Sequence, residues 1–93
     1  MKVSVRVRVR YGTLGDMLTP EQVAQRHPAT RQILRWFRSV HLPEHLQEVA
    51  RPMEVAAHGY VNILPDGPEL TTGLRKMLEA KDCMVRAAIE VDD

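Results

Sequence analysis

Polar and apolar side chains alternate strictly over residues 2–11. Basic or hydroxyl side chains occupy the even positions from Lys2 to Arg10, and valines and a tyrosine occupy the odd positions from Val3 to Tyr11. A period of two places each set on its own face of a β-strand. The pattern predicts one N-terminal strand with an apolar face and a strongly basic face. Its backbone needs a pairing partner, and the simplest one is the same strand of a second subunit.

A capping sequence begins the first of two short helices expected between residues 19 and 40. Thr19 can cap the helix, Pro20 suits its first turn, and Gln22 completes a capping box. The helix should end near His27, because Pro28 disfavours the helical conformation in the residue before it.

The second short helix, over about residues 28–39, combines an apolar side with a basic stripe. Arg31, Arg35 and Arg38 recur at steps of four and three, so they share one side of the helix. Guanidinium groups bind phosphates in a bidentate manner and stack on bases. The stripe is therefore a candidate phosphate-binding face, and the alternative is an ordinary solvated helix face.

Two longer apolar stripes predict a helical hairpin over residues 43–91. The first, over about 43–63, contains Pro52, which predicts a kink or a junction between two helices. Residues 65–68 form a short turn, and Pro68 can begin the final helix. Helices joined by so short a turn pack antiparallel.

The final helix has apolar side chains at alternating steps of four and three, the spacing of a seam that packs lengthwise on another helix. This seam comprises Leu70, Leu74, Met77, Lys81, Met84, Ala88 and Val91. A second seam beside it comprises Leu74, Leu78, Asp82, Val85 and Ile89. Lys81 and Asp82 interrupt both seams with charge. We interpret them as a polar register device within a helix–helix interface, and the alternative is that they line a ligand pocket.

Together these elements predict a single domain over residues 1–93 that is mainly α. An antiparallel helical hairpin (43–91) is preceded by short helices (19–40) and by one N-terminal β-strand with its loop (1–18). A chain of 93 residues with four aromatic side chains has a small core. We therefore expect it to gain stability by forming a homo-oligomer, a dimer or larger.

The charges are distributed unevenly along the chain. Residues 1–40 contain eight basic and two acidic side chains, whereas residues 41–93 contain five basic and ten acidic ones. Such asymmetry favours head-to-tail or antiparallel association and leaves the first half able to meet an anion.

Composition and spacing argue against catalysis and against a membrane location. The single cysteine, Cys83, cannot form an internal disulfide, and no apolar run approaches the ~20 residues of a membrane-spanning helix. We expect a cytoplasmic protein. His41 and His45 are four residues apart, but Pro43 lies between them and no further ligand completes a metal site. There is no glycine-rich phosphate loop, so we expect neither a cofactor nor a metal, and no enzyme activity.

The hairpin resembles a known group of phage proteins. The stretch from Met53 to Ile89, above all the turn after Leu64, the segment Leu78-Glu79-Ala80 and the terminal Ala87-Ala88-Ile89, resembles small proteins common in actinobacterial phages. These are similar to the helical hairpin shared by phage anti-CBASS and anti-Thoeris sponge proteins. With the preceding Phe37 to Pro43 element, the resemblance covers about residues 36–89.

The resemblance implies a binding function without catalysis. Proteins of that family form oligomers from packed hairpins and bind cyclic oligonucleotide second messengers without cleaving them. Sequestering the messenger in the infected host cell blocks anti-phage signalling and so serves immune evasion. The implied partners of this chain are a cyclic di- or trinucleotide and further copies of itself.

The resemblance also implies a set of site residues. The family carries an aromatic segment of the Phe-x-Tyr-His-Pro type that stacks on the bases, and Phe37 and His41 match it, with Ser39 or Val40 where the second aromatic would stand. Arg51 falls where the family has basic residues that meet phosphates. The expected ligand-binding residues are Phe37, Arg38, His41 and Arg51, with secondary contributions from Arg35, Thr72, Arg75 and Lys76.

Two other functions fit the same residues. The basic face of the N-terminal strand and the arginine stripe could bind DNA or RNA, with an affinity that falls steeply with salt. The protein could instead be a purely structural or host-interaction oligomer, in which the charge asymmetry serves assembly alone.

Overall fold

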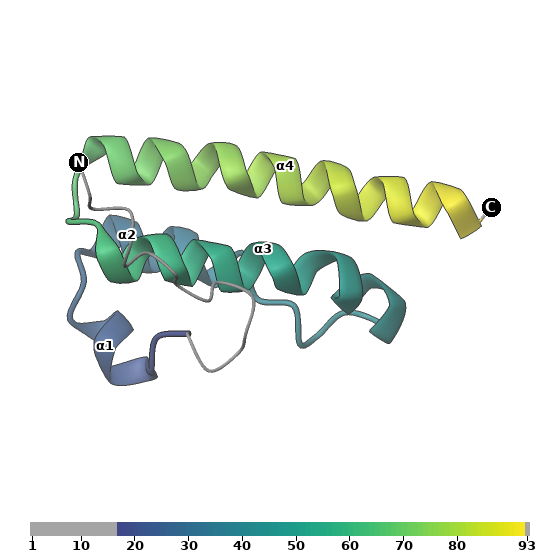
Figure 1. The fold of residues 1–93 in the computed structure, drawn as a ribbon. Helices are drawn as coiled ribbons and strands as arrows, with labels where there is room; N and C mark the ends of the chain where they lie inside the picture. The colour runs from purple at the N-terminus through teal and green to yellow at the C-terminus, as the bar shows by residue number, and fades with distance from the viewer. Residues whose placement is uncertain (1–16, 93) are drawn as a thin grey trace, which may run out of the picture.

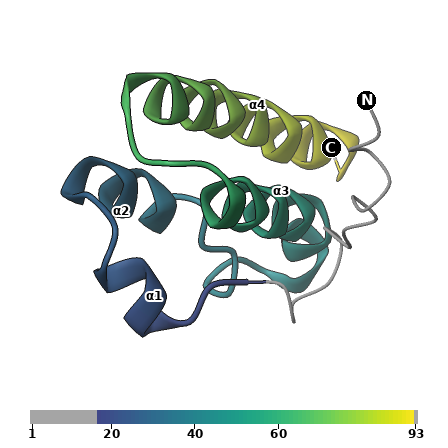
Figure 2. The same ribbon diagram turned by 60° about the vertical axis from the view of Figure 1, so that its left-hand side comes forward.

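The computed structural model describes residues 17–92, which form four helices. They are α1 (Pro20–Ala24), α2 (Pro28–Arg35), α3 (Glu44–Ile63) and α4 (Pro68–Asp92). The long helices α3 and α4 lie side by side and antiparallel, as Figure 1 shows. α2 packs against both of them, and α1 lies farther from α4 (Figure 2). The prediction of a mainly α fold with a helical hairpin is therefore confirmed for this part of the chain.

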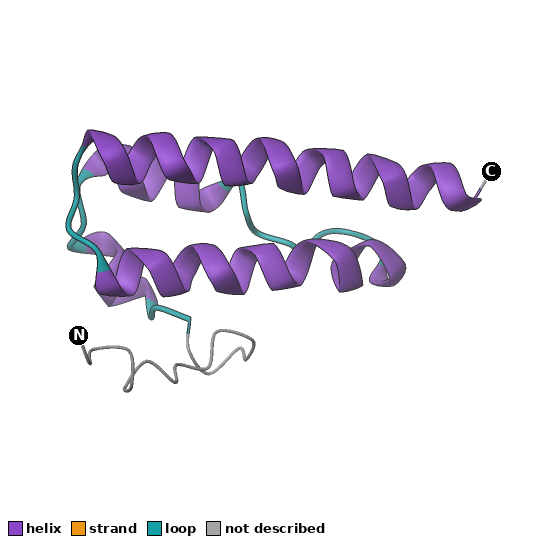
Figure 3. Cartoon of the chain, turned by 45° about the horizontal axis from the view of Figure 1, so that its top comes forward, coloured by secondary structure: helices purple, strands orange, loops and turns teal. Residues whose placement is uncertain are grey.

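All regular structure in residues 17–92 is helical, as the colouring of Figure 3 makes plain. The predicted strand over residues 2–11 lies outside the described residues. The expected homo-oligomer stays a prediction at this point.

The two short helices begin where the sequence places them and end earlier. Thr19 caps α1, and its Oγ1 accepts a hydrogen bond from the Gln22 amide at 3.2 Å while the Gln22 side chain accepts one from the Thr19 amide at 2.8 Å. α1 ends at Ala24 instead of near residue 27. His27 caps α2, because its Nδ1 accepts a hydrogen bond from the Ala29 amide at 3.0 Å.

α2 ends at Arg35, four residues before the expected end. The Trp36 amide donates to the Ile33 carbonyl and the Phe37 amide donates to the Leu34 carbonyl, both at 3.0 Å. Such bonds span three residues instead of four, so the chain tightens and leaves the helical path. This turn aims the Phe37 side chain into the core, where it is fully buried.

α3 continues through Pro52 as one helix, so of the two predicted alternatives, a kink and a junction between two helices, the junction is wrong. Pro52 cannot donate to the carbonyl of Glu48, but both residues are exposed, and water can reach a carbonyl on that side of the helix. Burial of the opposite side of α3, including Ala50, Ala57 and Val61, holds the helix together across the missing bond.

The core lies at the end of the hairpin nearer the turn. Its buried members come from three segments in contact: Leu34 and Phe37, Ala57 and Val61, and Leu70 and Leu74. Phe37 and Leu74 are the largest fully buried side chains. Burying such apolar side chains is worth about 1.5–3 kcal/mol each. The α2 segment is therefore an integral layer of the fold and holds the arginine stripe in place.

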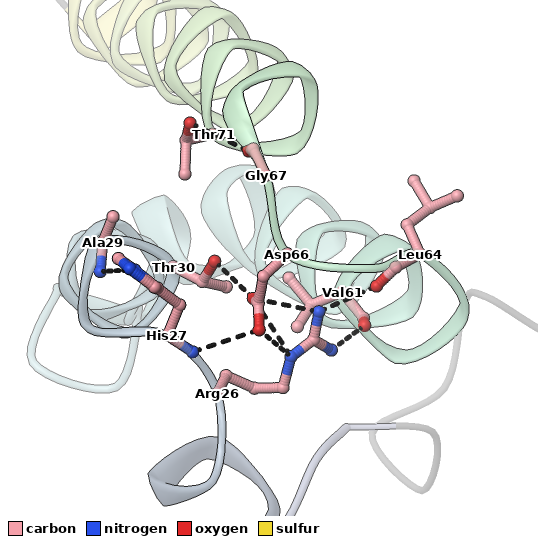
Figure 4. Close-up of polar contacts among 9 residues, drawn as sticks. All are labelled: Arg26, His27, Ala29, Thr30, Val61, Leu64, Asp66, Gly67 and Thr71. Carbon is pink, nitrogen blue, oxygen red and sulfur yellow. Dashed lines mark hydrogen bonds and ion pairs between the residues drawn. The ribbon is translucent and has the colours of Figure 1, made fainter.

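One ion pair fastens the α1–α2 connection to the hairpin turn (Figure 4). The guanidinium of Arg26 meets the carboxylate of Asp66, with Nη2 and Oδ1 3.1 Å apart. The same guanidinium donates to the carbonyl oxygens of Val61 and Leu64, the latter at 2.8 Å. It thereby satisfies carbonyls at the C-terminal end of α3 that no helical amide reaches.

Asp66 binds the start of α2 as well. Its carboxylate accepts hydrogen bonds from the His27 amide at 3.1 Å and from the buried Thr30 hydroxyl at 2.7 Å. Hydrogen bonds from Arg26 and Thr30 lower the pKa of Asp66 to about 2. The carboxylate therefore stays charged at neutral pH and joins the start of α2 to the turn between α3 and α4.

The far half of α4 is less covered. Met84 and Ile89 are 55% and 45% exposed, and in Figure 1 the end of α4 runs beyond the start of α3. Lys81 lies within the seam, its side chain only 11% exposed, and its Nζ is 3.3 Å from Oδ1 of Asp82. The polar interruption that the sequence shows thus lies beside the α3 contact, as a neighbouring ion pair.

Candidate functional site

A hollow of about 540 Å³ lies between α1, α2 and α3. Its polar lining comes from α2, the loop after α2 and α3, and its apolar lining from Leu34 of α2, the segment that leads into α1 and α1 itself. The lining residues are Met17, Leu18, Pro20, Val23, Ala24, Arg31, Leu34, Arg35, Arg38, Glu54 and His58. We call this hollow the arginine cavity. Its volume lies within the ~300–1,000 Å³ of typical small-molecule sites.

Three arginines give the cavity its charge. Arg31 is half-buried and donates from Nη1 to the Ala24 carbonyl at 3.1 Å, so α1 fixes its position. Arg35 and Arg38 are exposed, and neither forms an ion pair with any side chain among the described residues. Two guanidinium groups of the cavity are thus available to an anion from solution.

Among the described residues of the lining, Glu54 is the one acidic residue, and its carboxylate is bound by Ser39. Its Oε1 accepts hydrogen bonds from the Ser39 hydroxyl at 2.8 Å and from the Ser39 amide at 3.2 Å. Ser39 is itself buried. The carboxylate therefore holds the loop after α2 against α3, and the lining keeps an excess of positive charge.

His58 ties the start of the described chain to α3. The imidazole is 8% exposed, and its Nδ1 accepts a hydrogen bond from the Leu18 amide at 3.1 Å. Burial lowers the pKa of His58, while the nearby Glu54 charge acts in the opposite direction. The ring is neutral at pH 7 with Nδ1 as the acceptor, which is the state that this hydrogen bond requires.

The predicted site residues fall into separate places. Arg35 and Arg38 line the arginine cavity together. Phe37 does not join them: its side chain is 0% exposed and packs in the core, so it cannot stack on a ligand, and we correct its assignment. The exposed aromatic residue of this turn is Trp36, at 63%, which does not line the cavity.

His41 and Arg51 lie near the start of α3 and outside the cavity lining. Arg51 donates a hydrogen bond to the Gln47 side chain, and Gln47 donates in turn to the Leu42 carbonyl at 2.8 Å. Arg51 thus supports the loop that carries the exposed His41. This arrangement gives Arg51 a structural role in the loop.

Thr72, Arg75 and Lys76 are exposed on the first half of α4 and do not line the arginine cavity either. The structure therefore separates the expected residues into a pair at the cavity, a pair at the α3 loop and a group on α4. Of the expected residues, Arg35 and Arg38 are the two that line one hollow.

Three further charged or titratable residues line the cavity and are absent from the expected ligand-binding residues, namely Arg31, Glu54 and His58. Arg31 belongs to the arginine stripe that the sequence predicts as a phosphate-binding face, so periodicity does mark it. Glu54 and His58, four residues apart on α3, face α2 only because the hairpin packs there. No local signal in the sequence marks them.

No group of three or more potential metal ligands occurs among the described residues. None of the helices in that part of the chain is long and apolar enough to cross a membrane. No family model, characterised protein or solved structure matches this chain.

Proposed function

We propose that this protein is a non-catalytic binding protein for a phosphate-bearing ligand of the cyclic oligonucleotide class, which it sequesters in the arginine cavity. One observation carries the proposal. Arg35 and Arg38 stand exposed at a hollow of about 540 Å³, and no carboxylate of the described residues pairs with either.

The chemistry of the lining suits such a ligand. Guanidinium groups meet phosphate oxygens with charge-assisted hydrogen bonds, and the fixed Arg31 adds a third cation beside them. Leu18, Val23 and Leu34 offer apolar surface to a base or a sugar. A cyclic dinucleotide, with two phosphates and two bases, presents both kinds of surface.

Sequestration would block host anti-phage signalling, as the resemblance of the hairpin to phage sponge proteins suggests. Such a protein needs affinity and no catalytic group. The ligand should therefore leave the protein unchanged when the complex is denatured. Recovery of cleaved ligand would overturn this part of the proposal.

Calorimetry of the purified protein against cyclic di- and trinucleotides tests the proposal directly. We expect saturable binding of at least one of them, and a loss of at least about 100-fold in affinity for Arg35→Glu/Arg38→Glu. Two hydrogen bonds to charged groups are worth about 1.5 kcal/mol or more each, and 1.4 kcal/mol corresponds to a factor of ten.

The matched control is Arg75→Glu/Lys76→Glu, which makes the same charge change on α4. It should bind nearly as well as the unmodified protein. If this control loses binding and the cavity variant retains it, the ligand site lies on α4. No binding of any cyclic nucleotide would overturn the proposed function.

A second candidate function is nucleic-acid binding along the exposed arginine stripe of α2. A protein that meets many phosphates loses affinity steeply with salt, whereas a site with a few contacts loses much less. Titration with duplex DNA and single-stranded RNA over a range of salt concentrations separates the two. Tight, strongly salt-dependent binding without a fixed cyclic-nucleotide stoichiometry would favour this candidate.

A further inference from the structure

One flank of α4 repeats with a period of seven residues. The large apolar residues of the repeat are Leu70, Met77 and Met84. Three residues after each of them comes a small one, and these are Gly73, Ala80 and Ala87. Residues spaced seven apart with a second set three residues later form the seam of a coiled coil. Here one seam position is always large and the other always small.

The small residues of this repeat face away from α2, whereas Leu70 is buried in the core. Thr71 lies on the α2 side of α4, because it lines a hollow together with His27 and Thr30. At 100° per residue, Gly73 and Ala80 lie on the opposite side of the helix from Thr71. Gly73 and Ala87 are exposed, and a Cβ added at Gly73 would meet no atom within 4 Å.

An apolar groove of about 480 Å³ lies at one end of the same flank. Tyr60 and Leu64 from the end of α3 form one wall, and Gly73 and Met77 from α4 form the other. Tyr60 and Leu64 are 44% and 42% exposed. The flank and the groove together form an apolar strip that runs along α4 from the hairpin turn to the exposed Met84.

We propose that this strip binds α4 of a second copy of the chain, with the two helices antiparallel. In an antiparallel pair, the two seam positions face each other. Met77 then packs on Ala87 of the partner subunit, and Ala80 packs on Met84 of the partner subunit. Every layer combines one large and one small side chain. A parallel pair would alternate layers of two large and two small residues and leave gaps.

Charge supports the same register. The pairing places the exposed Lys76 beside Glu90 of the partner subunit, and two-fold symmetry repeats this pair. Cys83, which is also exposed, then lies next to its own copy at the symmetry axis. On the other side of the seam Lys81 approaches its copy, but its Nζ is paired with Asp82 at 3.3 Å.

The same register brings the last helical turn of the partner's α4 over the apolar groove. Tyr60 and Leu64 would then be covered, which accounts for their exposure in one subunit. The arginine cavity lies on the other side of the hairpin, so it stays open in the dimer. The dimer is thus independent of the proposed ligand.

Sedimentation velocity over a range of protein concentrations tests the interface. We expect a concentration-dependent dimer that Ala87→Glu converts to a monomer, because the new carboxylate would be buried in the seam. Ala29→Glu, the same change at an exposed position of α2, is the matched control and should still dimerise. Unchanged helicity of both variants by circular dichroism shows that they remain folded. A monomer at every concentration would overturn the proposal.

The charge pair and the cysteine test the register. Lys76→Glu and Glu90→Lys should each weaken the dimer about tenfold, and the double variant should restore it. A short bismaleimide should cross-link two copies of Cys83 rapidly. Cys83→Ser/Thr72→Cys moves the thiol about eleven residues, or ~16 Å, from the axis on each helix and should abolish cross-linking. Equal cross-linking of the unmodified protein and of this variant would show a parallel pair instead.

Discussion

At Asp66, one carboxylate receives hydrogen bonds from three residues of a single short segment. Nε of Arg26 donates at 3.2 Å, the His27 amide at 3.1 Å and the Thr30 hydroxyl at 2.7 Å. All of these donors stabilise the charged carboxylate, and they lower the pKa of Asp66 to about 2. An ordinary turn aspartate in the sequence is therefore the residue that fastens α2 to the hairpin.

The low pKa of Asp66 predicts how stability changes in acid. In the unfolded chain the group takes up its proton near pH 4, whereas in the fold it does so only near pH 2. Its contribution is present above about pH 4 and is lost as the pH falls to about 2. Asp66→Asn should therefore lower the thermal midpoint at pH 7, and the difference from the unmodified protein should shrink towards pH 2.

Thermal unfolding followed by circular dichroism at several pH values between 7 and 2 checks this expectation. Asp82→Asn serves as the control, because among the described residues Asp82 pairs only with its neighbour Lys81 and its side chain is 48% exposed. A difference between Asp66→Asn and the unmodified protein that stays constant over this range would contradict the role given to the charge.

The sequence predicts where an individual side chain lies only where the pattern that fixes it is local. The spacing of Arg35 and Arg38 predicts that they share one side, and both line the cavity, although α2 ends at Arg35 and Arg38 lies in the loop after it. The assignment of Phe37 to ligand contact is wrong, because α2 ends in a tight turn that sends Phe37 inward and leaves Trp36 63% exposed. Which of two adjacent aromatic residues is buried depends on that turn.

At the scale of elements, caps and turns were predictable because they are encoded within a few residues. The capping box at Thr19 and the turn before Pro68 are of this kind. The end of α2 was not, because Ser39 is held by Glu54, fifteen residues further along the chain. Pro52 shows the same limit, since packing of α3 decides that the helix continues through it.

Gly73 gives α4 a weak point that its surroundings do not require. Glycine in a helix interior is less favourable than alanine by about 1 kcal/mol, and an added Cβ would meet no atom of the described residues within 4 Å. Gly73→Ala should raise the free energy of unfolding by about 1 kcal/mol. Urea unfolding measures the change. Arg75→Gly, two residues on and also exposed, should lower it by a similar amount.

The sign of the change in the free energy of unfolding on Gly73→Ala shows whether another group touches this position of α4. If Gly73→Ala destabilises the protein, a neighbour approaches the glycine more closely than alanine allows. In the proposed dimer that neighbour is the last helical turn of the partner's α4. Repeating the measurement at a concentration where sedimentation shows only monomer then separates the helix effect from the contact.

At the scale of the whole molecule, the arginine cavity depends on one link between distant segments. Leu18 and His58 are forty residues apart, and the hydrogen bond from the Leu18 amide to Nδ1 keeps the segment before α1 against α3. Leu18 lines the cavity beside the arginines. Protonating His58 would replace an acceptor with a donor, so the link and this wall of the cavity depend on the neutral ring.

Because burial lowers the pKa of His58, the fold favours the neutral ring more than the unfolded chain does. As the pH falls below about 6.5, His58 takes up a proton in the unfolded state before it does so in the folded state. The free energy of unfolding therefore decreases in this range. The charged groups that line the cavity with His58 are Glu54 on α3, whose charge opposes the shift, and Arg31, Arg35 and Arg38.

His58→Gln separates the proton from the hydrogen bond, since a glutamine oxygen can accept from the Leu18 amide but does not titrate. We expect the unmodified protein to lose stability between pH 7 and pH 5, and His58→Gln to vary much less over the same range. Urea unfolding at fixed pH steps measures both. Equal pH dependence of the two proteins would show that another group titrates.

A ligand that binds the cavity should itself bind more weakly at pH 5 in the unmodified protein alone, because only there does protonation release Leu18 from the wall.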